Sequence, residues 1–240
     1  MIPCPAPEPP SAHLHDEHSH ELRRIAGAID HTLLRPEATE ADVVAAAIEA
    51  YELAVVALCV SSSMVRPAAR ESAGLFKVAS TIGFPSGAVP TLAKTVEACA
   101  ALGAGASELD MVMNLGAAKS GDWRSVANDI AAVVREAQPA GALVKVIIES
   151  AALTAPEIVE ACHTAVDAGA AYVKTSTGFH PAGGATVEAV RLMVASVPSS
   201  VGVKASGGIR DLATARAMLD AGARRLGTSS TASILLAGQP

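Results

Sequence analysis

Three lysines lie inside short apolar runs of the sequence, where charged side chains are unexpected. Lys145 lies in VKVII, Lys174 in YVKTS and Lys204 in VGVKAS. A buried ammonium group costs several kcal/mol unless it is paired or loses its charge. One explanation is structural, with each lysine paired to a carboxylate such as Glu149 or Asp110. The other explanation is chemical.

In the chemical explanation, the lysines converge and one acts as a neutral amine that attacks a carbonyl carbon. Such a lysine must lower its pKa from about 10.4 to about 7–8, which requires roughly 4 kcal/mol. A second ammonium group about 5 Å away supplies about 3 kcal/mol at an effective dielectric constant of about 20. Desolvation adds the remainder. Two or three clustered lysines are therefore the arrangement that a Schiff-base enzyme needs.

Other residues in or beside apolar runs could assist such a lysine. Asp110, in SELDMVMN, could pair with a lysine or transfer protons beside it. Asp30 and His31 could orient a lysine, although a turn or capping role suits Asp30 equally well. Cys59 ends an apolar run, and we expect it to support the site as a small buried residue rather than as a nucleophile.

Glycine and hydroxyl residues follow the last strand-like runs and suit a phosphate group. The segments are TSTG at 175–178, SGG at 206–208 and GTSS at 227–230. Barrel enzymes often bind phosphate through the loops after their seventh and eighth strands, using backbone N–H groups. Each segment alone is also typical of an ordinary turn. Together they predict a phosphate site.

From about residue 25, short β-branched runs alternate with longer amphipathic runs, as in parallel sheets with crossing helices. The eight candidate strands are 29–34, 55–60, 77–83, 108–113, 144–149, 172–176, 202–206 and 225–228. Eight such segments favour a (β/α)₈ TIM barrel over an open doubly wound sheet, which is the alternative. Helix starts are indicated by Thr39 with Asp42, Thr154 with Glu157, Asp122 and Asp211.

The composition restricts the class of protein. Half of the 240 residues are apolar, and 24 acidic side chains outnumber 18 scattered basic ones, so we expect a small-molecule partner and no nucleic acid. No run of 18 apolar residues and no secretory signal pattern is found, so we expect a soluble, cytoplasmic protein that does not bind membranes. The four cysteines are far apart, and reduced thiols are expected.

The N-terminal segment differs from the rest of the chain. Residues 1–20 combine five prolines with four histidines and show no hydrophobic period, so we expect a disordered tail before a single barrel domain at 21–240. The histidines could bind a metal adventitiously. No second ligand cluster completes a metal site, so no metal is expected to be functional.

The sequence resembles the deoxyribose-phosphate aldolase family of class I aldolases from about residue 28 to 234. The motifs that carry the resemblance are IDHTLLRPEAT, TIGFPSG, ELDMVMNLGAAKSGDW, VKVIIES, YVKTSTGF, VGVKASGGIR and RLGTSS. The resemblance implies reversible cleavage of 2-deoxy-D-ribose 5-phosphate into acetaldehyde and D-glyceraldehyde 3-phosphate in deoxyribonucleotide catabolism. It implies no metal or other cofactor, and a homodimer is possible.

The residues alone do not rank Lys145 against Lys174, whereas the resemblance implies a ranking. It implies that Lys145 forms the Schiff base, that Lys174 depresses its pKa and shares in proton transfer, and that Asp110 donates or accepts protons. Lys204 remains an electrostatic neighbour. The residues implied to surround the phosphate are Gly178, Gly207, Gly208, Gly227, Ser229 and Ser230.

Two departures from the family pattern and two alternative functions stay open. Arg35 stands where the family usually has Lys, and Ser150 where Thr is common, which concerns the fine positioning of the substrate. A sugar-phosphate isomerase or epimerase would share the glycine-rich loops but would leave the lysines unexplained. A catalytically silent barrel that senses sugar phosphates would bind its ligand without turnover.

Overall fold

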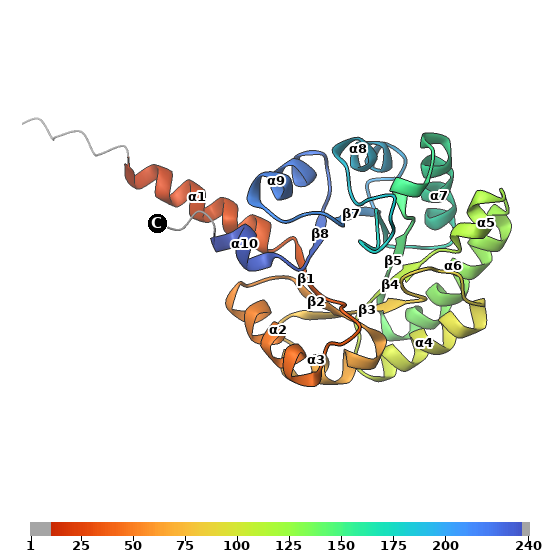
Figure 1. Cartoon of the computed structure of the whole chain (residues 1–240), viewed down its shortest axis with the longest axis horizontal. Helices are drawn as coiled ribbons and strands as arrows, with labels where there is room; N and C mark the ends of the chain where they lie inside the picture. The colour runs from red at the N-terminus through yellow and green to blue at the C-terminus, as the bar shows by residue number, and fades with distance from the viewer. Residues whose placement is uncertain (1–10, 237–240) are drawn as a thin grey trace, which may run out of the picture.

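Eight parallel strands close into a barrel with helices around it (Figure 1). The computed structural model describes the backbone of residues 11–236 and the side chains of residues 19–236. Strands pair in sequence order, and β8 pairs with β1. The strands are β1 (Ile29–Leu33), β2 (Ala57–Val60), β3 (Lys77–Ile82), β4 (Glu108–Val112), β5 (Leu143–Ile147), β6 (Tyr172–Lys174), β7 (Gly202–Ser206) and β8 (Arg225–Thr228). The predicted TIM barrel is confirmed, and the open sheet is excluded.

Helices follow the strands and form the outer ring. They are α1 (Ser11–Ala26), α2 (Glu40–Glu52), α3 (Val65–Ser72), α4 (Thr91–Gly103), α5 (Leu115–Lys119), α6 (Trp123–Ala137), α7 (Ala155–Asp167), α8 (Val187–Ala195), α9 (Leu212–Asp220) and α10 (Thr231–Leu236). Short 3₁₀ turns lie at Ser62–Met64, Gln138–Ala140 and Ser150–Ala152. Within the described residues, no helix is long and apolar enough to cross a membrane.

The predicted helix starts are confirmed by side-chain caps. Thr39 with Asp42 and Thr154 with Glu157 each form a reciprocal capping box. Asp122 and Asp211 accept hydrogen bonds from the third backbone N–H of α6 and α9. These contacts satisfy backbone donors that the first helical turn leaves without partners. These four helices therefore begin at defined positions.

The barrel has an aliphatic outer layer and an ionic interior. Successive side chains of a strand point to opposite faces. In β4, Leu109 and Met111 belong to the aliphatic core, while Glu108 and Asp110 contact lysines of other strands. Burial of the aliphatic layer between strands and helices stabilises the frame that holds these charges in place.

The N-terminal segment differs from its prediction where the structure describes it. Residues 11–20 belong to α1 and are helical rather than disordered, whereas residues 1–10 lie outside the described residues. Arg216 of α9 donates two hydrogen bonds to the carboxylate of Glu21, at 2.7 and 2.6 Å, which ties α1 to the barrel. Figure 1 shows α1 beside α10, with its first turns extending away from the barrel.

Candidate active site

The strand register brings the predicted site residues together inside the barrel. Lys145 lies beside Asp110 in the β4–β5 pairing, and Lys174 lies beside Lys204 in the β6–β7 pairing. Asp30 joins them from β1. All five side chains are buried. The predicted convergence of three lysines is therefore seen in the structure.

Lys145 is surrounded by carboxylates. Its Nζ lies 2.5 Å from Glu108 Oε2, 2.9 Å from Asp110 Oδ1 and 3.1 Å from Asp30 Oδ2. Burial lowers the pKa of Lys145, but Asp110, Asp30 and Glu108 together outweigh it and raise the pKa well above its ordinary value. An amine held as ammonium has no free electron pair, so this environment disfavours Lys145 as a nucleophile.

Lys174 has a different environment. Its Nζ contacts one carboxylate among the described residues, Asp110 Oδ2 at 2.7 Å. Burial lowers the pKa of Lys174, and the ammonium of Lys204 lowers it further, so that the net shift is downward despite Asp110. Lys174 is also the one lysine among the residues that line a pocket of about 780 Å³ in the described part of the chain. It combines access to ligand with a tendency to be neutral.

Lys204 lies between two carboxylates. Its Nζ contacts Asp110 Oδ2 at 2.6 Å and also Asp30 Oδ2. Burial lowers the pKa of Lys204, but Asp110 and Asp30 raise it above its ordinary value overall. Gly227 gives this side chain room, because a Cβ there would lie 3.1 Å from Lys204 Cε. Lys204 therefore stays charged next to Lys174.

Asp110 is the centre of the cluster. It accepts hydrogen bonds from Lys145, Lys174 and Lys204. Burial raises the pKa of Asp110, but the three lysines overcome that effect and hold it well below its ordinary value. Asp110 is thus a carboxylate at neutral pH. It can relay protons between the amines and a bound ligand.

Sequence reasoning missed two charged residues of the same cluster. Arg225 Nε donates to Asp30 Oδ1, and its Nη2 donates to Glu108 Oε2, both at 2.7 Å. Glu108 lies two positions before Asp110, so the two-residue period of a strand could have placed both carboxylates on one face. No local signal in the sequence connects Arg225 to either residue. The barrel ion cluster hereafter means Asp30, Glu108, Asp110, Lys145, Lys174, Lys204 and Arg225.

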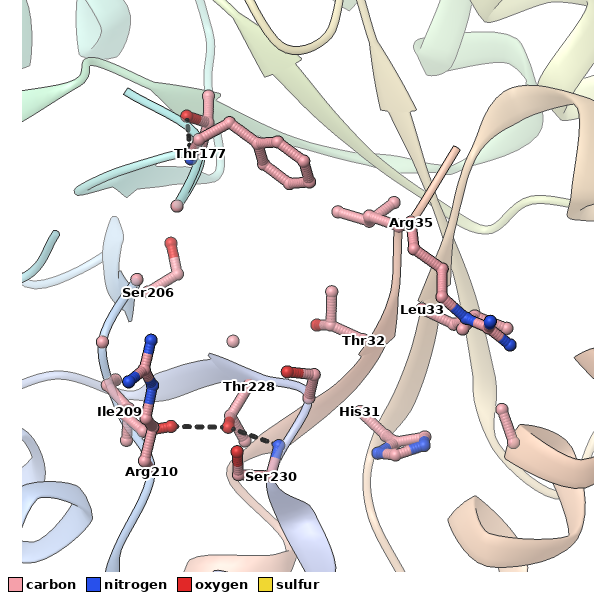
Figure 2. Close-up of a pocket in the computed structure, with 18 of the residues that line it drawn as sticks. His31, Thr32, Leu33, Arg35, Thr177, Ser206, Ile209, Arg210, Thr228 and Ser230 are labelled. Carbon is pink, nitrogen blue, oxygen red and sulfur yellow. Dashed lines mark hydrogen bonds between the residues drawn. The ribbon is translucent and has the colours of Figure 1, made fainter. Parts of the chain in front are cut away.

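A pocket of about 780 Å³ opens at the carboxyl ends of the strands, next to Lys174. Figure 2 shows Ser206, Ile209 and Thr228 on one side of it and Thr32 and Arg35 on the other. The pocket lining includes all six residues predicted to surround a phosphate: Gly178, Gly207, Gly208, Gly227, Ser229 and Ser230. The structure thus brings these residues together, as the sequence suggested.

Hydrogen bonds between neighbouring loops hold the rim of this pocket. Thr228 Oγ1 donates to the carbonyl of Ile209 at 2.7 Å and accepts from the N–H of Ser230 at 2.9 Å (Figure 2). Gly207 has a φ of +87°, and Gly184 approaches its carbonyl so closely that a Cβ on Gly184 would lie 2.2 Å from that oxygen. Such close backbone approach requires glycine.

Glu149 supports the loop that follows Lys174. Its carboxylate accepts hydrogen bonds from Thr177 N at 3.2 Å and from Thr177 Oγ1 at 2.6 Å. Glu149 has a φ of +55°, a left-handed conformation that costs energy in a residue with a side chain. The structural ion pair that the sequence allowed between Glu149 and a lysine is absent from the described contacts. Glu149 instead holds Thr177, which lines the pocket.

The remaining candidates have supporting positions. Cys59 is fully buried, and burial raises the pKa of its thiol, which suits a core residue. His31 contacts Thr231 Oγ1 through Nδ1 at 2.7 Å, beside the rim rather than beside a lysine. Arg35 lines the pocket and pairs with Asp42, and Ser150 N donates to the Thr175 carbonyl at 2.8 Å. No metal-binding group of three or more His, Cys, Asp or Glu occurs in the described part of the chain.

Comparison with known proteins identifies the family. Residues 24–236 match the DeoC/LacD family aldolase model. A deoxyribose-phosphate aldolase from Mycobacterium bovis is 56% identical over 216 residues, which cover 88% of this chain and 95% of that protein. Another from Kocuria rhizophila is 54% identical over 211 residues, covering 88% and 95%.

A solved structure of a deoxyribose phosphate aldolase from Aeropyrum pernix shares the fold. It superposes with a TM-score of 0.84 at 34% identity, covering 95% of this chain and 98% of that chain. The chain belongs to the DeoC/LacD family of aldolases, and it is a carbon–carbon lyase of that family.

Proposed function

We propose that the protein reversibly cleaves 2-deoxy-D-ribose 5-phosphate into acetaldehyde and D-glyceraldehyde 3-phosphate through a lysine Schiff base. The names of the relatives support this substrate. The observation that carries the proposal is Lys174, a lysine with a lowered pKa beside a pocket whose rim is rich in glycine and hydroxyl groups. Such an amine suits attack on an aldehyde, and such a rim suits a phosphate.

We assign the Schiff base to Lys174 in place of Lys145, the residue that the family resemblance implied. Lys145 contacts three carboxylates and does not line the pocket, whereas Lys174 contacts one carboxylate and does. To react, Lys145 would have to break its ion pairs and lose a tightly held proton. Breaking a buried pair costs about 3–5 kcal/mol.

In the proposed reaction, neutral Lys174 attacks the aldehyde carbon of the open-chain sugar, and loss of water gives an iminium ion. Removal of the proton from the C3 hydroxyl then allows the C2–C3 bond to break, and its electron pair moves toward the iminium nitrogen. D-glyceraldehyde 3-phosphate leaves. The resulting enamine takes a proton at C2, and water hydrolyses the iminium to release acetaldehyde and free Lys174.

Proton transfer in these steps is assigned to Asp110 together with a water molecule. Asp110 Oδ2 lies 2.7 Å from Lys174 Nζ and 2.6 Å from Lys204 Nζ, so it connects the reacting amine to a second proton donor. The charge of Lys204 favours the neutral form of Lys174 before each turnover. The steps use side chains and water alone.

The phosphate of the substrate is assigned to the rim formed by the loops after β6, β7 and β8. Backbone N–H groups around Gly178, Gly207, Gly208 and Ser229 can donate to its oxygens. Arg210 and Arg35 also line the pocket and add positive charge at its mouth. A phosphate held there orients the carbon chain toward Lys174.

Borohydride reduction in the presence of acetaldehyde tests this assignment. Reduction converts the iminium into a stable secondary amine, so the modified peptide gains an ethyl group that mass spectrometry locates. We expect the adduct on Lys174 in the wild-type protein, none at this position in Lys174→Met, and a retained Lys174 adduct in Lys145→Met. An adduct on Lys145 would restore the ranking that the resemblance implied, and no adduct at all would rule out the Schiff base.

The cytoplasmic location and the homodimer remain predictions. The Aeropyrum pernix relative is described as a tetramer. We propose that this protein also works as a homo-oligomer in the cytoplasm, beside the phosphorylated metabolites on which it would act. Light scattering coupled to size-exclusion chromatography measures the number of subunits.

A further inference from the structure

We propose that Arg225 and Glu108 set the charge state of Lys174 from the end of the barrel opposite the pocket, without touching Lys174 or the substrate. The inference rests on the proposed role of Lys174 as the nucleophile. Arg225 is the first residue of β8 and Glu108 is the first residue of β4, so both lie at the strand ends opposite the pocket. They are positioning residues rather than catalytic ones.

Ion pairs connect both residues to Lys174 through the barrel interior. Arg225 contacts Asp30 and Glu108, each at 2.7 Å. The same two carboxylates contact Lys145, whose third partner is Asp110. Asp110 then contacts Lys174 at 2.7 Å. A charge change at Glu108 therefore reaches Lys174 through Lys145 and Asp110, and a charge change at Arg225 passes first through Asp30 or Glu108.

The charges of the barrel ion cluster do not cancel when every member is ionised. Within the described residues, the cluster has four cations, Lys145, Lys174, Lys204 and Arg225, against three carboxylates, Asp30, Glu108 and Asp110. An uncompensated charge in a buried site is costly, and loss of one proton removes it. Charge balance thus requires one neutral lysine.

The number of contacts decides which lysine becomes neutral. Lys145 contacts three carboxylates and Lys204 contacts two, whereas Lys174 contacts one. Lys174 has the least attraction to lose, and the lowered pKa of Lys174 agrees with this order. Arg225 supplies the fourth positive charge, and arginine does not release its proton in proteins. Arg225 therefore forces the deprotonation onto a lysine.

β2, β3 and β6 bring few other titratable groups near the cluster. β2 contributes the Cys59 thiol, whose pKa is raised by burial, and β6 contributes the Tyr172 phenol, a neighbour of Arg225. β3 contributes none, because its charged residue, Lys77, is exposed. The seven cluster members come from β1, β4, β5, β6, β7 and β8. The balance of charge therefore depends on these seven side chains.

The two residues act on Lys174 with opposite sign. Arg225→Met leaves three lysines against three carboxylates, so full protonation is balanced and the pKa of Lys174 rises. Glu108→Gln leaves four cations against two carboxylates, so the pKa of Lys174 falls. A unit charge about 10–15 Å away changes a pKa by on the order of one unit at an effective dielectric constant of about 20.

The experiment measures the pH dependence of Lys174 adduct formation with acetaldehyde and borohydride, followed by peptide mass spectrometry, together with the pH profile of kcat/KM. The proteins are the wild type, Arg225→Met, Arg225→Lys, Glu108→Gln and the double variant Arg225→Met with Glu108→Gln. Arg225→Lys is the control for side-chain shape, because it keeps the positive charge as long as Lys174, which contacts one carboxylate, is still the first lysine to lose its proton.

We expect the acidic limb of the profile to move up by about one pH unit in Arg225→Met and down in Glu108→Gln. The double variant restores one excess charge and should return toward the wild type, and Arg225→Lys should keep the wild-type position. If Arg225 and Glu108 had a purely structural role, their variants would lower the rate at every pH and leave the acidic limb in place. That result overturns the proposal. If the acidic limbs of Arg225→Met and Glu108→Gln move in the same direction, the proposal is also overturned.

Two other outcomes also distinguish the proposals. If Arg225→Met does not fold, as judged by circular dichroism, the direction of the Glu108→Gln shift decides, and no shift contradicts the proposal. Absence of any wild-type adduct on Lys174 would instead contradict the proposed function itself, independently of the limb positions.

Discussion

The three buried lysines differ in how many carboxylates hold their ammonium groups. Lys145 contacts three, Lys204 two and Lys174 one. Because each carboxylate favours the charged form, this number orders the lysines from the most to the least firmly protonated. The side chain with the fewest partners also lines the pocket. Residue chemistry and access therefore favour the same lysine.

Gly227 tests whether the position of Lys204 matters for the reaction. A Cβ at this residue would lie 2.9 Å from Ser206 Cβ and 3.1 Å from Lys204 Cε, so Gly227→Ala forces the Lys204 amine to shift. We expect kcat/KM to fall about 10- to 100-fold, because small misplacements of catalytic groups have effects of this size. Steady-state kinetics at neutral pH measures the change.

The matched control is Gly103→Ala, since a Cβ at Gly103 meets nothing within 4 Å and the residue ends α4. That variant should keep the wild-type kcat/KM. Unchanged kinetics in Gly227→Ala, with a folded protein, would show that the amine of Lys204 tolerates displacement. The reaction would then not depend on the exact position of the Lys204 amine.

At the scale of elements, the sequence predicted each strand to within about two residues. Runs such as those of β3 and β7 are bounded by glycines and by capped helices, so local patterns are sufficient to locate them. β6 is shorter than predicted and ends at Lys174. Ser150 N donates to the Thr175 carbonyl, and Thr177 donates to Glu149, so the chain leaves the strand early and Thr177 lines the pocket.

The roles of the lysines were beyond local patterns for a physical reason. The pKa of each lysine depends on contacts with residues that are distant in the sequence, such as Arg225 with Asp30 and Glu108. A strand period tells which face a side chain takes, but not which partners from other strands meet it there. The sequence therefore predicted which lysines lie in the site, whereas their order of reactivity depends on contacts that the sequence pattern does not show.

Glu149 links the end of β5 to the loop after β6, and its charge should matter for substrate binding. Its carboxylate accepts from both the N–H and the hydroxyl of Thr177, and hydrogen bonds to charged groups contribute about 1.5–3 kcal/mol. We expect Glu149→Gln to loosen the loop and raise KM for the sugar phosphate about 10-fold, with a smaller change in kcat. Steady-state kinetics separates the two constants.

Glu188→Gln is the control for this variant, because Glu188 is an exposed carboxylate in the first turn of α8. Its KM should match that of the wild type. If Glu149→Gln lowers kcat while KM stays constant, then Glu149 affects the chemical step and not the binding of substrate, and the assigned role as loop support is wrong.

At the scale of the whole molecule, the aliphatic layer between strands and helices stabilises a barrel whose interior would carry one excess positive charge if every member of the barrel ion cluster were ionised. Four cations and three carboxylates lie in that interior among the described residues. Active sites commonly cost stability because their groups are held for reaction rather than for mutual satisfaction. The loss of stability should arise mainly at Lys174, the lysine with the fewest carboxylate partners.

Stability measurements on two lysine variants should therefore give opposite signs. Lys174→Met replaces the buried amine that cannot be protonated without an excess charge and leaves Asp110 with two lysine partners, so we expect the free energy of unfolding to rise by about 1–2 kcal/mol. Lys145→Met leaves Asp30, Glu108 and Asp110 each short of one cation, so we expect a loss of about 3–5 kcal/mol. Urea unfolding at pH 7 measures both, with activity assays on the same samples. Destabilisation of similar size in both variants would mean that Lys174 stabilises the fold through a structural ion pair. It would contradict the expectation that the reactive state of Lys174 lowers the stability of the protein.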